Sequence, residues 1–242
     1  MNMQTLFGAL QPKVVLGVGA HPDDLDFGFA GSAAAFAQQG AQVYYLIVTD
    51  GSKGSADRAA VPEQLTALRR DEQRAAARIL GVSDVFFLDY VDGTLQNTLE
   101  LRRDIARFIR RLKPDVVVTM DPSVLYAVEH GFINHPDHRA AGQATLDAVF
   151  PLARDHLSFP ELLAEGLEPH QTATVLLVNF TDRNFAVDIS KTLPLKLQAL
   201  AAHISQMLHL QATQAKVTTW AATAGSAYGV THAESFVRID VD

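Results

Sequence analysis

Short apolar runs, typical of buried strands, alternate over residues 13–150 with stretches whose apolar positions have helical spacing. The helical pattern is clearest at 99–112, where Leu101, Ile105 and Ile109 recur at regular intervals and a proline follows. In chain order, the sequence predicts strands at 13–18, 42–48, 85–88 and 116–119, and helices at 28–39, 63–80, 99–112 and 138–150.

Strands that alternate with helices predict a mostly parallel sheet, because right-handed crossover connections bring each strand back in the same direction. The rest of the chain is less regular, with a strand expected at 174–179 and a helix at 194–210. The sequence shows no repeat, low-complexity tract or linker, so residues 1–242 are expected to form a single domain. The predicted fold class is therefore α/β, a three-layer sandwich in which the part from residue 151 onward adds a cap or an interface.

Composition and charge narrow the classes of function. A net charge of −7 argues against a general nucleic-acid binder, because phosphate contacts need clustered Lys and Arg. The chain has no cysteine, so a metal ion could be held only by nitrogen and oxygen ligands. The lack of cysteine also fits a reducing cytoplasm, which is the expected location. No signal-peptide pattern is evident and no apolar run approaches the roughly 20 residues that span a bilayer, so no membrane partner is expected.

Two segments rich in metal-type ligands follow two of the predicted strands. His-Pro-Asp-Asp at 21–24 comes after the strand at 13–18, and His-Pro-Asp-His at 135–138 comes after the strand at 116–119. Either segment alone is more simply a turn, because Pro and Asp favour turns. Two of them are hard to explain in that way. Because the ends of parallel strands meet at one edge of a sheet, the two segments are expected to build one metal centre.

Ligand chemistry divides the roles within this centre. His21, Asp24 and His138 form a set of two imidazoles and one carboxylate, which suits catalytic zinc and also iron(II). Asp23 is then free to accept the proton of a bound water as general base. His135, when protonated, can stabilise an oxyanion and protonate the leaving group.

Asp137 lies between the two histidines of the second segment. A carboxylate there is expected to hold His135 in one tautomer and to raise its pKa. The simpler alternative is that Asp137 caps the helix that follows. The other histidines are expected to be mostly ordinary surface or core residues; they are His130, His156, His170, His203, His209 and His232.

A nucleotide-binding function is an alternative to the metal centre. Gly17-Val18-Gly19 follows the first strand, as in a dinucleotide fingerprint. No third glycine stands at the required spacing, and the carboxylates of Asp23 and Asp24 would repel a pyrophosphate. The sequence therefore argues against this function.

The two segments resemble the motifs of the PIG-L/LmbE-like family of metal-dependent N-acetylglucosamine deacetylases. The resemblance covers residues 14–144, with weaker echoes at 153–155 and 233–236. It implies a Rossmann-like fold, a bound zinc ion and hydrolysis of an acetamide on a small amino sugar or related compound. It also implies the ligand and catalytic roles given above, and, since relatives are often oligomeric, a homo-oligomer.

Two further site residues enter only through this resemblance. Arg69 matches a family arginine near the substrate, and Asp92 matches a carboxylate that binds sugar hydroxyls. The simpler alternatives are an ion pair on a helix surface for Arg69 and a turn for Asp92. Many members carry Glu directly after the Asp pair, where this chain has Leu25 and then Asp26. That form is similar to the branch that includes bacillithiol-type deacetylases.

Three functions are compatible with these residues. Beside deacetylation, the same zinc chemistry would serve an amidase acting on a thiol conjugate or a natural product. From a different class, the chain could be a metal-dependent sugar-binding module without turnover, although binding alone needs neither Asp23 nor His135. Loops at 52–62, 92–98 and 123–133 are expected to shape the pocket, and the last of them is also a candidate lid or subunit contact.

Overall fold

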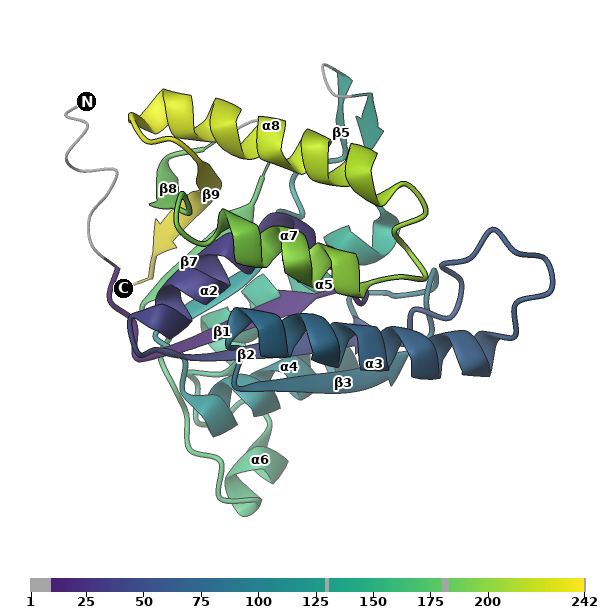
Figure 1. The fold of residues 1–242 in the computed structure, drawn as a ribbon. Helices are drawn as coiled ribbons and strands as arrows, with labels where there is room; N and C mark the ends of the chain where they lie inside the picture. Colours follow the sequence, from purple (N-terminus) through teal and green to yellow (C-terminus); the bar gives the residue numbers. More distant parts are fainter. Residues whose placement is uncertain (1–9, 129–130, 180–182, 242) are drawn as a thin grey trace.

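The computed structural model describes residues 10–128, 131–179 and 183–241. Its centre is a seven-stranded sheet of order β3-β2-β1-β4-β7-β9-β8 (Figure 1). Neighbouring strands from β3 to β7 are parallel, and β9 is antiparallel to β7 and to β8. The predicted α/β fold with a mostly parallel sheet is thus confirmed. The strands are β1 (Val14–Gly19), β2 (Gln42–Thr49), β3 (Asp84–Tyr90), β4 (Val116–Met120), β7 (Thr174–Val178), β8 (Phe185–Asp188) and β9 (Ala233–Asp240).

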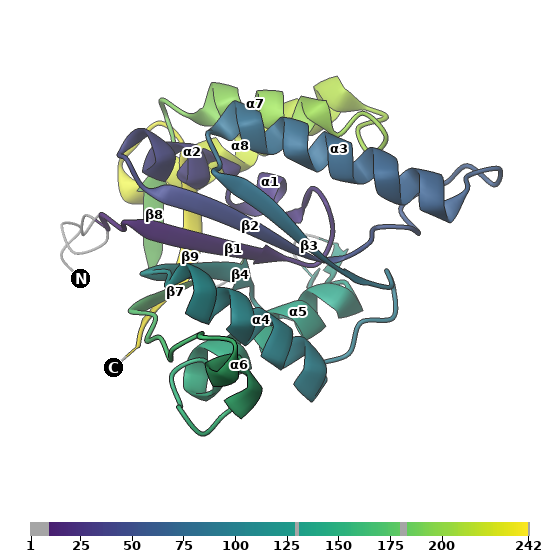
Figure 2. The same ribbon diagram turned by 90° about the horizontal axis from the view of Figure 1, so that it is seen from below.

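Helices cover both faces of the sheet, which gives the three layers. Figure 2 shows one layer made of α1 (Asp24–Gly28), α2 (Ala30–Gln38), α3 (Pro62–Leu80), α7 (Leu193–Ala202) and α8 (Leu210–Tyr228). The opposite layer contains α4 (Leu99–Leu112), α5 (Pro136–Asp147) and α6 (Pro160–Ala164). A π-helical segment η3 (Ala148–Leu152) continues α5, and a small hairpin of β5 (Tyr126–Ala127) and β6 (Phe132–Ile133) precedes it.

The continuous apolar runs of β1 and β4 reflect burial on both faces. Along β1, Val15 belongs to the core under α2 and α3, whereas Leu16 and Val18 belong to the core under α4 and α5. Every residue of β4 is buried. Central parallel strands read as unbroken hydrophobic runs for this reason, whereas an edge strand would alternate.

The sheet reverses its winding direction between β1 and β4. The chain moves from β1 outward to β2 and β3, and then returns to pair β4 with the other side of β1. Val18 is in register with Thr119, so the segments that follow both strands start at the same edge of the sheet. In open α/β sheets, ligands bind in the crevice at such a switch point.

The C-terminal part differs in detail from the sequence prediction. Helices α7 and α8 cover one face as a cap would, while β7, β8 and β9 extend the same sheet. The helix expected at 194–210 ends at Ala202, and α8 follows as a separate helix. Helix α8 lacks a stripe of large apolar residues; its buried positions are Val217, Ala221, Ala224 and Gly225. Within the described ranges, no helix has both the length and the hydrophobicity needed to cross a bilayer.

Candidate active site

The loop after β1 turns sharply into α1 and brings two predicted ligands together. Asp23 has φ 98° and ψ −27°, a conformation that costs a non-glycine residue about 1–3 kcal/mol. Hydrogen bonds hold the turn: Asp24 Oδ2 accepts the N–H of His21 at 2.7 Å, and the Asp23 carbonyl accepts the N–H groups of Asp26 and Phe27. The side chains of His21 and Asp24 therefore lie next to each other.

The second segment forms the start of α5. His135 is the N-cap and Pro136 occupies the first turn, where a missing N–H costs nothing. One turn further on, His138 points its Nδ1 at Asn134 Oδ1, 3.2 Å away. Its other nitrogen, Nε2, is left to face Asp24 across the edge of the sheet.

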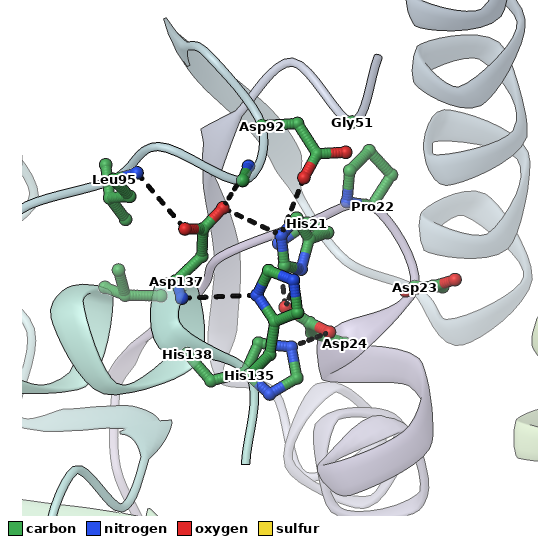
Figure 3. A network of polar contacts seen from close by, with 12 residues as sticks. His21, Pro22, Asp23, Asp24, Gly51, Asp92, Leu95, His135, Asp137 and His138 are labelled. Atoms are coloured by element: carbon green, nitrogen blue, oxygen red, sulfur yellow. Dashed lines mark hydrogen bonds and ion pairs between the residues drawn. The ribbon is translucent and has the colours of Figure 1, made fainter. Parts of the chain in front are cut away.

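Five of the six predicted metal and catalytic side chains lie together with Asp92 in one histidine–aspartate cluster (Figure 3). The sixth, Asp23, lies beside it. Asp24 lies between two imidazoles, with Oδ2 3.4 Å from His21 Nδ1 and Oδ1 3.0 Å from His138 Nε2. In tetrahedral zinc sites, bonds of about 2.0–2.2 Å keep ligand atoms about 3.3–3.6 Å apart. The separation at His21, 3.4 Å, lies within this range, and the one at His138, 3.0 Å, lies just below it. This donor set thus fits a metal ion. The cluster consists of His21, Asp24, Asp92, His135, Asp137 and His138.

The His135 ring extends the cluster beyond the expected ligand set. Its ring centroid lies 4.7 Å from that of His21 and 5.4 Å from that of His138. One ligand atom from each of these three histidines lies within 4.8 Å of the others. His135 is therefore close enough to touch a group bound beside His21 and His138.

The carboxylate of Asp137 faces His21, not His135 as expected. It accepts hydrogen bonds from the backbone N–H groups of Gly93 and Leu95, at 2.6 Å and 3.1 Å. These two bonds turn it toward His21 Nε2, 3.2 Å away, where Asp92 Oδ1 also lies at 3.3 Å. One nitrogen of His21 thus faces Asp24 and the other faces carboxylates. A carboxylate behind a metal-binding histidine fixes its tautomer and orientation.

The backbone of Asp137, by contrast, does orient His135. Its N–H donates to His135 Nδ1 at 3.2 Å, which places the proton of the neutral ring on Nε2. The expected rise of the His135 pKa is not found. Burial and the positive charge of His21 outweigh the attraction of the Asp137 carboxylate and lower the pKa of His135.

Electrostatics favour a positive charge in the cluster. Burial alone would lower the pKa of His21, but the charge of Asp24 and hydrogen bonds to Asp137, Asp24 and Asp92 raise it to about 12. The pKa of His138 is also raised, since Asp24 outweighs burial. The surrounding carboxylates therefore stabilise positive charge at this place, and a bound metal ion would supply such a charge.

Asp23 lies beside the cluster, against α3. Burial and repulsion by Asp24 outweigh the attraction of Arg69 and raise the pKa of Asp23 to about 7. A pKa near the operating pH suits a general base. Figure 3 shows its carboxylate directed away from His135 and His138. Its Oδ2 lies 3.4 Å from Arg69 Nη2.

Arg69 and Asp92 are both buried parts of the site. Arg69 donates to the carbonyls of Gly51 and Pro22 at 2.8 Å and 2.7 Å, so it is not a surface ion pair. Asp92 Oδ2 accepts the backbone N–H of Lys53 at 3.0 Å. Arg69 therefore fastens two loops of the site, and Asp92 joins a third loop to His21.

The sequence did not predict the buried hydrogen bonds that hold the turn at Asp23 in place. Gln73 Oε1 accepts the Asp23 N–H at 2.8 Å, and His203 Nε2 lies 2.7 Å from Asp26 Oδ2. The acidic residue at position 26, in the place where the motif departs from the family pattern, was the one signal available. Of the histidines expected to be ordinary, His203 is fully buried, and His130 lies outside the described residues.

Comparison with known proteins identifies the family. The profile of the PIG-L family, described as GlcNAc-PI de-N-acetylase, matches residues 16–149, which include both motif segments. The chain is 36% identical over 194 residues to a diacetylchitobiose deacetylase from Thermococcus kodakarensis, covering 80% of this chain and 70% of that protein. It is 31% identical over 197 residues to a probable N-acetyl-alpha-D-glucosaminyl L-malate deacetylase 2 from Bacillus anthracis, covering 79% and 80%.

A solved structure extends the similarity to the whole fold. The N,N'-diacetylchitobiose deacetylase from Pyrococcus horikoshii superposes with a TM-score of 0.89 at 30% identity, covering 99% of this chain and 88% of that one. With nearly the whole chain covered, the match includes the sheet as well as the motif segments. The chain therefore belongs to the PIG-L family of deacetylases.

Proposed function

We propose that this protein is a metal-dependent deacetylase that removes the acetyl group from a small N-acetylglucosamine-type substrate, releasing acetate and a free amine. The observation that carries the proposal is the placement of Asp24 between His21 and His138, with His135 alongside. The relatives named as deacetylases of diacetylchitobiose and of an N-acetylglucosaminyl malate support the substrate class.

His21, Asp24 and His138 would hold the metal ion, with zinc the first candidate and iron(II) the second. When bound, such an ion lowers the pKa of its water and polarises the amide carbonyl. Asp137 and Asp92 face the far nitrogen of His21 and keep that ring in position.

The chain's own residues manage the protons of the reaction. Asp23 accepts a proton from the attacking water, which adds to the acetamide carbonyl carbon. For this step, the Asp23 side chain has to turn from Arg69 toward the histidines. His135 presents Nε2–H to the developing oxyanion and keeps that proton. Asp23, which holds the proton taken from the water, returns it to the amine nitrogen when the C–N bond breaks.

The two residues expected at the substrate have different roles in this proposal. The guanidinium of Arg69 is engaged by two carbonyls and by Asp23, so it acts through the base. The carboxylate of Asp92 lies beside His21 and remains the candidate contact for a sugar hydroxyl. We further propose that residues 1–242 work as a single domain, in the cytoplasm, as a homo-oligomer.

Acetate release tests the reaction and separates it from its alternatives. Metal-stripped protein is assayed on N-acetylglucosamine and N,N'-diacetylchitobiose before and after adding zinc or iron(II). We expect release of equal amounts of acetate and free amine only with metal. Retention of zinc without hydrolysis of any amide would favour a sugar-binding module. Hydrolysis of other amides, but never of an acetamide, would favour the amidase.

A further inference from the structure

A buried hydrogen-bond chain runs behind Asp23 and joins three helices. It begins at the Asp23 N–H, which donates to Gln73 Oε1 in α3 at 2.8 Å. Gln73 Nε2 donates to Asp26 Oδ2 in α1 at 2.7 Å, and His203 Nε2, at the end of α7, lies 2.7 Å from the same oxygen. Gln73, Asp26 and His203 have no exposed surface. The backbone of Asp23 is therefore tied to the interior of the protein.

Asp26 determines which way the Gln73 amide faces. A carboxylate can only accept hydrogen bonds, so it selects the NH₂ end of the amide and leaves the carbonyl for the Asp23 N–H. The reversed amide would place oxygen against carboxylate and NH₂ against N–H. His203 holds Asp26 from the other side. The orientation of Gln73 thus follows from its two buried neighbours.

The hydrogen bond with Gln73 is made by the backbone N–H of Asp23, a residue with an unfavourable conformation. Asp23 has a φ of 98°, which L-residues rarely adopt, and its side-chain direction depends on that backbone. Arg69, one turn before Gln73 on α3, faces the Asp23 carboxylate. Helix α3 therefore contacts this residue at both its N–H and its carboxylate.

We propose that Gln73, oriented by Asp26 and His203, is a positioning residue that holds the backbone of Asp23 in the conformation its carboxylate needs for catalysis. This rests on the proposed function, in which Asp23 is the general base. A small misplacement of a catalytic group is enough to cost about 100-fold in rate. The Gln73 side chain hydrogen-bonds to Asp23 and Asp26, neither of which is an expected metal ligand, so its loss should leave the metal in place.

The first test compares Gln73→Met, which keeps the length but removes both hydrogen bonds, with Gln64→Met on the exposed side of the same helix. In zinc-loaded protein, we expect Gln73→Met to speed hydrogen exchange of the Asp23 amide at least about 10-fold and to lower kcat by about 10- to 100-fold. KM should change less than about two-fold and zinc content should stay the same. Gln64→Met should match the wild type.

Unchanged exchange at Asp23, or unchanged kcat with faster exchange, would overturn the proposal. If Gln73→Met does not fold, Gln73→Asn provides the same test, since it keeps an amide that is too short to bridge both partners. Wild-type protein that releases no acetate would overturn the proposed function instead. The exchange measurement would then still decide whether Gln73 restrains Asp23.

A reversal of donor and acceptor distinguishes positioning from general packing. Gln73→Glu places a carboxylate against Asp26 and should lower kcat as much as Gln73→Met does. The double variant Gln73→Glu with Asp26→Asn restores the pairing, because the amide at position 26 can donate both to the carboxylate at position 73 and to a neutral His203. We expect kcat to recover to within about three-fold of the wild type. A double variant no faster than Gln73→Glu would contradict the proposal.

Discussion

Two groups of buried or half-buried polar residues adjoin α1, and they differ in the side chains that supply positive charge. The histidine–aspartate cluster holds three carboxylates and three imidazoles, so its negative charge is uncompensated unless the rings are protonated. The other group, here the support network, pairs Glu234 with the ammonium group of Lys196 and Asp26 with the imidazole of His203. It consists of Asp26, Gln73, Lys196, His203 and Glu234.

The ion pair of the support network is complete without any ligand. Lys196 Nζ lies 2.5 Å from Glu234 Oε1 and also donates to the Phe27 carbonyl. Glu234 accepts the N–H groups of Gly31 and Ser32 at the start of α2, where the helix dipole favours a negative charge. The cluster contains no Lys or Arg, so a bound cation can supply its positive charge, whereas the Lys196–Glu234 pair supplies its own and holds elements together.

Removal of a central ligand should have the largest effect. Asp24→Ala takes away the carboxylate between His21 and His138, so we expect loss of zinc binding together with essentially all activity. Calorimetric titration with zinc and acetate release on the same sample measure both. Full activity with normal zinc content would show that the cluster is not the metal site.

Removal of the lysine from the support network should lower the free energy of unfolding and leave zinc binding unchanged. Lys196→Met leaves Glu234 buried without its cation, which typically costs about 3–5 kcal/mol. Urea unfolding measures the loss, with the exposed Lys191→Met as the matched control. The folded fraction should keep its zinc content. A loss of zinc without loss of stability would reverse our assignment of the two groups.

His135→Ala tests the part of the cluster that is not needed to hold the metal. We expect kcat to fall by about 100- to 1,000-fold, because a donor to the oxyanion is lost, while zinc content stays constant. The exposed His156→Ala serves as control and should behave as wild type. If zinc is lost as well, His135 is a ligand.

The smallest expected effect concerns the carboxylate behind His21. Asp137→Asn keeps the shape but weakens the hydrogen bond to His21 Nε2, and such changes typically cost about 10- to 100-fold in metal affinity or activity. Competition with a zinc chelator measures the affinity. An unchanged affinity and an unchanged kcat would mean that Asp137 serves only to fix Gly93 and Leu95.

The sequence predicted the two groups unequally well, for a physical reason. The ligands of the cluster lie within two short segments that follow central strands, and burial of those strands on both faces makes them easy to recognise. The support network joins α1, α3, α7 and β9, from positions far apart in the chain. Only the packed fold brings such residues together, and no local spacing indicates it.

Secondary structure elements were likewise predicted unequally well. Helix α4 was predicted at its observed bounds, because Leu101, Ile105 and Ile109 form one apolar face that is fully buried. Helix α8 is rich in Ala and Thr, and strand β8 has only four residues, so neither gives a clear period. The direction of the Asp137 carboxylate was missed because two backbone N–H groups of a distant loop set it.

The most direct test of the central claim compares the adjacent residues Asp23 and Asp24. Zinc content and acetate release are measured on Asp23→Asn in the same way as on Asp24→Ala. We expect Asp23→Asn to bind one zinc ion as the wild type does and to lose about 100- to 10,000-fold in kcat, as for a general base. Loss of zinc from Asp23→Asn, or retention of wild-type kcat, would contradict the division between metal ligand and base.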